Sequence, residues 1–148
     1  MVKILWVDDE IELLKPHVLF LRGKGYEVDT CNNGYDAIDM ATEGSYDLII
    51  LDPPAFAKHK NVLRNALQGY RKLNAIAFEK IKPGGILFTF SCSQAVSKEL
   101  FRTTVFSAAA QAGRRVRILH QLAQPADHPI NIYHPEGEYL KGLVLYVE

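Results

Sequence analysis

The chain has 148 residues, enough for one domain and too few for two of ordinary size. Hydrophobic residues make up 48% and charged residues 23%, which is typical of a globular domain, and no apolar run reaches the ~20 residues of a membrane-spanning helix. Acidic residues directly follow the first apolar stretch, which argues against a signal peptide. Cys31 and Cys92 lie far apart without metal-ligand spacing, so a reduced, cytoplasmic protein is expected.

Charge is distributed unevenly along the chain. Residues 1–52 carry four basic and eleven acidic side chains, a balance of −7, and residues 53–148 carry thirteen basic and six acidic ones, a balance of +7. Such asymmetry indicates a nucleic-acid partner for the basic part, two joined sequences of different origin, or a chance distribution over one surface.

Hydrophobic periodicity predicts strands and helices that alternate along the chain. Continuous or alternating apolar runs predict strands at 2–7, 26–30, 47–51, 86–90, 116–122 and 140–147. Helical spacing of apolar residues predicts helices at 11–21, 35–43, 62–81 and 97–112. Pro16 is expected to kink the first helix, and the proline-containing stretch 124–138 is expected to be a loop.

This order predicts a three-layer α/β/α fold, a doubly wound and mostly parallel sheet of flavodoxin-like and Rossmann-like character. The expected strand order is 2-1-3-4-6-5, with the last strand antiparallel because no helix precedes it. Functional groups of such sheets lie at the carboxyl ends of the strands. Those positions hold Asp8, Asp9, Asp52, Ser91 and Cys92.

The first part of the chain resembles the receiver domain of response regulators, close to the PorX-like branch. The resemblance covers residues 3–52 and rests on KILWVDDE, GYEV, NNGYDAI and YDLIILD. It implies that Asp52 is a phosphoacceptor and that Asp8, Asp9 and Asp52 hold Mg²⁺, a cation that prefers carboxylate oxygens. It also implies a hydroxyl residue after the fourth strand, which Ser91 supplies, and a lysine ending the fifth strand, which is absent.

The remainder resembles the C-terminal part of a class I methyltransferase, of the RlmI type that methylates carbon 5 of a cytosine in large-subunit ribosomal RNA. The resemblance rests on LDPPAFAKHK, IKPGGILFTFSCSQ and ADHPINIYHPEGEYLKG. It implies that Asp52, Pro53 and Pro54 lie beside the methyl donor and target base, and that Cys92 attacks the cytosine ring. The turn after the first strand lacks the glycines with which this family binds S-adenosylmethionine.

The two resemblances together predict an engineered chimera in one domain, with a receiver-like half at residues 1–52 and a methyltransferase-like half at residues 53–148. The join is expected between Tyr46 and Pro54, with one shared core containing Ile4, Trp6, Ile49, Leu51, Leu87 and Phe88. We expect no enzymatic activity, with Asp52 and Cys92 as vestigial catalytic residues. We also expect no required cofactor beyond possible Mg²⁺, no partner, no membrane contact, and no RNA binding.

Two alternatives stay open: a receiver-type phosphoacceptor module that binds Mg²⁺ at Asp8, Asp9 and Asp52, and an S-adenosylmethionine-dependent rRNA cytosine-5 methyltransferase fragment. Two further sets of residues are weighed against a solvated surface. Asp127, His128 and His134 are interpreted as a solvated loop rather than a metal site. Arg114, Arg115 and Arg117 form either a phosphate-binding patch or a solvated face.

Overall fold

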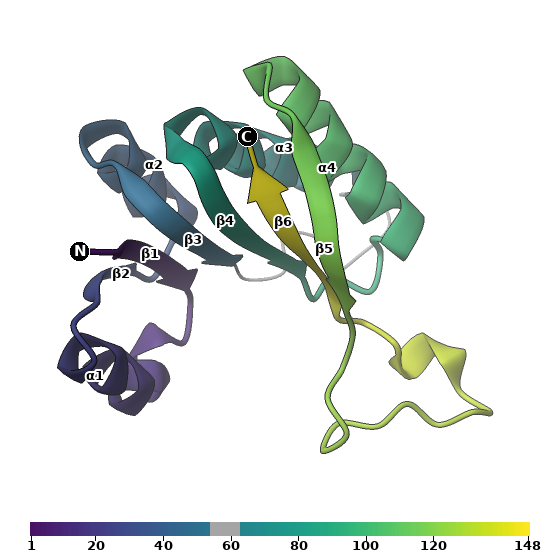
Figure 1. The fold of residues 1–148 in the computed structure, drawn as a ribbon. Coiled ribbons are helices and arrows are strands. Elements are labelled where there is room, and N and C mark those ends of the chain that lie inside the picture. The colour runs from purple at the N-terminus through teal and green to yellow at the C-terminus, as the bar shows by residue number, and fades with distance from the viewer. Residues whose placement is uncertain (54–62) are drawn as a thin grey trace.

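One mixed sheet organises the chain, as the computed structural model shows for residues 1–53 and 63–148 (Figure 1). The six strands are β1 (Lys3–Asp8), β2 (Glu27–Cys31), β3 (Tyr46–Asp52), β4 (Ile81–Ser91), β5 (Val116–Leu122) and β6 (Lys141–Val147). Their order is β2-β1-β3-β4-β6-β5, and β6 pairs antiparallel with both of its neighbours. The predicted fold class and strand order are therefore confirmed.

Helices cover both faces of this sheet. They are α1 (Lys15–Gly23), α2 (Gly34–Glu43), α3 (Leu63–Lys80) and α4 (Lys98–Ala112). Figure 1 shows α1 on one side and α2, α3 and α4 on the other. In the described part of the chain, no helix is long and apolar enough to cross a membrane.

Pro16 divides the first predicted helix. A 3-10 turn spans Ile11–Leu14, and α1 starts afterwards with Pro16 in its first turn. Proline is tolerated there because the first N–H groups of a helix have no partner within the helix. The expected kink is thus a break into two short elements.

Two apolar clusters form the core, one on each face of the sheet. The larger cluster lies under α2, α3 and α4 and includes Ile49, Leu51, Phe78, Leu87 and Leu145. The smaller one lies under α1 and consists of Ile4, Ile11, Val18 and Val28, with Trp6 packed against it. The expectation of a single core is wrong, because alternate residues of a strand point to opposite faces.

Strand β4 begins five residues earlier than the sequence predicts, and Gly85 makes this extension possible. A Cβ atom at Gly85 would lie 2.8 Å from the Lys82 carbonyl oxygen and 2.9 Å from that of Asp47. Lys82 lies in a bulge of β4 between Ile81 and Ile86, and Asp47 lies on β3. Both oxygens are backbone atoms of the sheet, so they have little freedom to move.

We expect Gly85→Ala to lower the free energy of unfolding by about 2 kcal/mol, the usual cost of overpacking. Urea denaturation measures this change. Gly23→Ala is the matched control, because no atom lies within 4 Å of the Cβ position there. Equal midpoints for the two variants would contradict the steric explanation.

Candidate functional site

Carboxylates gather where β1 and β3 end. The two strands are parallel and Asp8 stands opposite Asp52 in their register. Asp8 is buried, and its Oδ1 accepts a hydrogen bond from the Glu10 backbone N–H at 2.8 Å. Burial, followed by the charge of Asp8, raises the pKa of Asp52 to about 7, and burial also raises the pKa of Asp8. The pair therefore retains a proton close to neutral pH.

Cys92 lies in the turn that follows β4, at the same edge of the sheet. Its neighbours Ser91 and Ser93 are fully buried, and the Ser93 N–H donates to Ser91 Oγ at 3.3 Å. Burial and the nearby charge of Asp52 raise the pKa of the Cys92 thiol. Parallel strand ends thus bring Asp8, Asp52 and Cys92 together, and Asp9 is exposed beside them.

Lys141 belongs to this edge too, and the sequence interpretation assigned it no role. It is only 5% exposed, and its Nζ donates to the Ser93 and Tyr139 carbonyl oxygens, each at 2.6 Å. The antiparallel pairing of β6 with β4 places it opposite Ser91. The sequence shows only a lysine at the start of an apolar strand. That this lysine lies beside the Cys92 turn follows from the pairing of β6 with β4, which the residue alone does not reveal.

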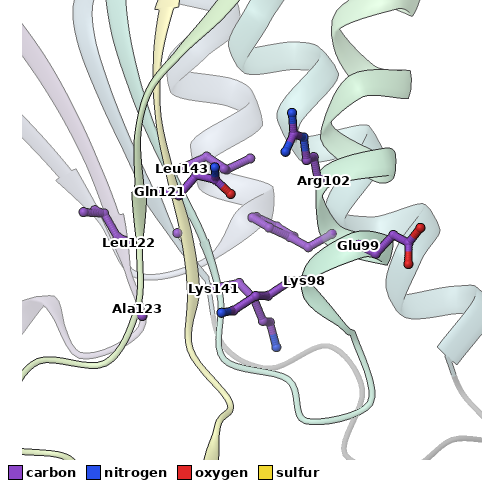
Figure 2. A pocket seen from close by; sticks show the side chains of 10 residues that line it. Lys98, Glu99, Arg102, Gln121, Leu122, Ala123, Lys141 and Leu143 are labelled. Atoms are coloured by element: carbon purple, nitrogen blue, oxygen red, sulfur yellow. The ribbon is translucent and has the colours of Figure 1, made fainter.

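Two cavities open near this edge. One of about 400 Å³ lies at the carboxyl ends of β1 and β2, lined by apolar Ile11 and Met40 and by polar Asn32, Asp36 and Asp39. The other, of about 340 Å³, lies between the first turn of α4 and the paired strands β5 and β6. Figure 2 shows Lys98, Arg102 and Lys141 around this second cavity.

The predicted Mg²⁺ site at Asp8, Asp9 and Asp52 stays a prediction. Across residues 1–53 and 63–148, no group of three or more His, Cys, Asp or Glu side chains is arranged to hold a metal ion. His128 pairs with the adjacent Asp127 at 3.3 Å on an exposed loop, as a solvated loop allows. Pro53 is buried beside Asp52, whereas Pro54 lies outside the described residues.

Arg114 has neither of the roles considered for it from the sequence. Its Nη1 donates to the Phe78 carbonyl oxygen at 2.6 Å and to that of Ile81 at 3.0 Å, and its Nε donates to the Glu148 carbonyl oxygen at 2.8 Å. These acceptors include the last turn of α3, so the guanidinium caps the helix C-terminus. Arg115 and Arg117 are exposed.

The chain is similar to proteins named Ribosomal RNA large subunit methyltransferase I. It is 51% identical to the one from Tolumonas auensis over 100 residues and 49% identical to that from Aeromonas salmonicida over 100 residues, in each case 68% of this chain and 25% of the relative. The chain thus spans about a quarter of the length of these relatives. The 100 matched residues exceed the 96 that residues 53–148 contain, so the match extends into the first part. No family model matches the chain.

Solved structures of low identity share the fold. A putative SAM-dependent methyltransferase from Streptococcus mutans superimposes with a TM-score of 0.71 at 14% identity, covering 97% of this chain and 44% of that one. A putative methyltransferase complexed with SAH superimposes at 0.69, with 16% identity and the same coverage. The response regulator TrrA from Thermotoga maritima is 30% identical, and the match covers 55% of this chain and 65% of that one. Its TM-score is 0.39, which is too low to support the receiver assignment.

These relatives correct three expectations. The chain was expected to be no enzyme, to require no cofactor, and to bind no RNA. Relatives with about half of their matched residues identical are named rRNA methyltransferases, and a protein of the same fold is complexed with SAH. All three expectations rested on the turn after β1, which lacks glycines. The residues that resemble a methyltransferase, Asp52 at the end of β3 and Cys92 directly after β4, were the better guide.

Proposed function

We propose that this chain is part of an S-adenosylmethionine-dependent methyltransferase that acts on carbon 5 of a cytosine in RNA. The observation that carries the proposal is that the half-buried thiol of Cys92 lies close enough to Asp52 for the charge of this carboxylate to raise its pKa. The pKa of Asp52 itself is about 7. The identity to rRNA methyltransferases over 68% of the chain supports the substrate class. A joined origin of residues 1–52 and 53–148 stays a prediction.

The chemistry needs a nucleophile and a proton carrier. Asp52 accepts the thiol proton of Cys92, and the sulfur forms a bond to carbon 6 of the cytosine ring. This addition moves negative charge onto the ring, and the charge is neutralised when Asp52 gives the proton to ring nitrogen 3. A carboxyl group with a pKa of about 7 suits both transfers, because its proton leaves and returns with similar ease.

Carbon 5 becomes electron-rich in this adduct and takes a methyl group, which S-adenosylmethionine supplies when bound. Asp52, which is ionised after it has protonated nitrogen 3, accepts the proton from carbon 5, and the Cys92 sulfur leaves as the double bond of the ring re-forms. The proton on nitrogen 3 returns to the sulfur, and Asp52 releases the carbon 5 proton to solvent. Every bond formed to sulfur is broken again, so the enzyme returns to its starting state.

The described residues fit the methyl donor at three of its groups. Asp36 and Asp39 line the cavity beside β2 and offer acceptors for ribose hydroxyls, and Ile11 and Met40 offer apolar contact for a purine ring. The carboxylates Asp8, Asp9 and Asp52 favour the positive charge of a sulfonium group.

A 5-fluorocytidine RNA oligonucleotide tests the proposal directly. Fluorine at carbon 5 leaves no proton to remove, so the bond between Cys92 and the RNA persists after methyl transfer. We expect a protein–RNA adduct on a denaturing gel only when S-adenosylmethionine is present. Cys92→Ser should form none, and Cys31→Ser, at the other thiol, should form as much as the unaltered chain.

Thermal melting tests binding separately. A ligand that binds only the folded state raises the melting temperature, by an amount set by its concentration relative to Kd. We expect a rise with S-adenosylmethionine, and a parallel melt with millimolar Mg²⁺ tests the predicted metal site. No rise with the methyl donor together with no RNA adduct would overturn the proposed function.

A further inference from the structure

Lys141 is a buried cation without an acidic partner among the described residues. Both of its hydrogen bonds go to neutral carbonyl oxygens, those of Ser93 and Tyr139. Glu138, the carboxylate whose charge acts on it, is itself paired with Lys98 at 2.6 Å. A lone buried ammonium is costly, and burial accordingly lowers its pKa. A nonpolar side chain at this position would avoid that cost.

The hydrogen bonds of Lys141 hold the turn that carries Cys92. Position 141 is opposite Ser91 in the β4–β6 register, and its side chain reaches past Cys92 to the Ser93 carbonyl oxygen. The Val96 N–H donates to this same oxygen at 3.2 Å. The residues on both sides of Cys92 are therefore fastened to β6, and the cysteine itself stays partly exposed.

The ammonium also acts on the thiol through its charge. Cys92 and Lys141 are close enough that each shifts the pKa of the other. Among residues 1–53 and 63–148, the other charges that act on the sulfur, those of Asp52 and Asp9, are negative and oppose the approach or formation of an anion. Lys141 carries a positive charge that offsets them.

We propose that Lys141 is the positioning residue of the Cys92 turn, which it fixes in place while it supplies the positive charge that lets an anionic group form or arrive at the sulfur. The inference deepens the proposed function and rests on it in naming Cys92 as the nucleophile. The contribution of the charge is open to measurement without methyl donor or RNA.

Two alkylating reagents separate the charge from the structural role. Iodoacetamide is neutral and iodoacetate is anionic, and both react with the same sulfur. We expect Lys141→Met to lower the ratio of the iodoacetate rate to the iodoacetamide rate at Cys92 on the order of fivefold, the effect of one nearby charge in a partly solvated site. Mass spectrometry of the Cys92 peptide measures both rates.

Two substitutions serve as controls. Lys141→Arg keeps the charge and should keep the ratio within about twofold of the unaltered value. Lys98→Met removes an exposed cation from the same cavity and should also leave the ratio unchanged. Lys141→Gln, which is neutral but retains a donor, replaces the methionine variant if that one shows no cooperative melting transition.

Each outcome decides the proposal. The proposal is supported if the ratio of the iodoacetate rate to the iodoacetamide rate falls in the neutral variants and is unchanged in Lys141→Arg. Equal slowing with both reagents, which a purely structural role would produce, overturns it. Because alkylation needs neither RNA nor methyl donor, a lowered ratio without an RNA adduct would refute only the proposed function. An RNA adduct with an unchanged ratio would refute only the role of Lys141.

Discussion

Asp52→Asn is expected to stabilise the protein at pH 8 by about 3 kcal/mol while it abolishes the proposed RNA adduct. An ionised Asp52 is half-buried next to Asp8, and a pKa raised from 3.8 to about 7 corresponds to about 4 kcal/mol at 1.36 kcal/mol per unit, discounted here for partial exposure. Asparagine has nearly the same shape and carries no charge. Urea denaturation at pH 8 measures the gain.

The pH dependence has a definite sign. The folded state holds the Asp52 proton more tightly than the unfolded state does, so the free energy of unfolding falls as pH rises from about 4 to about 7. The stability due to this proton is complete below the unfolded value of 3.8 and is lost as pH passes the folded value of about 7. Asp52→Asn should flatten this decline.

Asp47→Asn provides a control of opposite sign. Asp47 accepts a hydrogen bond from the Lys3 backbone N–H at 2.9 Å and lies 3.4 Å from Lys82 Nζ, contacts that lower the pKa of its carboxyl group. Its ionised form therefore stabilises the fold, and the variant should be less stable than the unaltered chain at pH 8. Destabilisation by Asp52→Asn would contradict the electrostatic description of the site.

The second large effect is expected from Arg114→Ala, which should cost about 3 kcal/mol. The substitution removes three hydrogen bonds from a charged donor and leaves part-buried carbonyl oxygens of Phe78 and Ile81 without it. It also removes a positive charge from the C-terminal end of α3, where it interacts favourably with the helix dipole. The urea midpoint reports the loss.

Arg115→Ala is the matched control for this variant. Arg115 is the next residue along the chain, equal in charge, and exposed. Its removal should change the free energy of unfolding by less than about 0.5 kcal/mol, as at most surface positions. Similar losses for the two variants would mean that net charge, rather than the cap on α3, explains the effect.

Much of the fold could be predicted because strand and helix periodicities are strong in this chain. The buried runs of β1, β3 and β4 are unmistakable. The stretch between β5 and β6 contains a 3-10 turn at Pro135–Gly137 but no α-helix, and the expected lack of a crossover helix indicated that β6 is antiparallel. The extension of β4 through Gly84 and Gly85 could not be predicted, since glycines after a helix ordinarily end it and begin a turn.

The carboxylates and the thiol of the site could be predicted from the sequence, whereas the buried cation Lys141 could not. Asp8, Asp52 and Cys92 follow strands whose parallel ends share one edge, so chain order alone was enough to group them. Lys141 comes from the opposite end of an antiparallel strand, and its burial depends on insertion between β4 and β5. Arg114 likewise acquires its partners only through the packing of α3.

The place of β6 in the sheet has a consequence for biosynthesis. β6 leaves the ribosome after β4 and β5, yet it separates these two strands in the sheet. Until residue 147 has emerged, β5 has no strand to pair with, and β4 presents an open hydrogen-bonding edge. Residues 1–91 form the four neighbouring strands β2, β1, β3 and β4 and are free to associate during translation, whereas Lys141 reaches the cysteine turn only after β6 has been synthesised. From the synthesis of Cys92 until that of Lys141, the nascent chain thus carries the Cys92 thiol without the residue that fastens its turn.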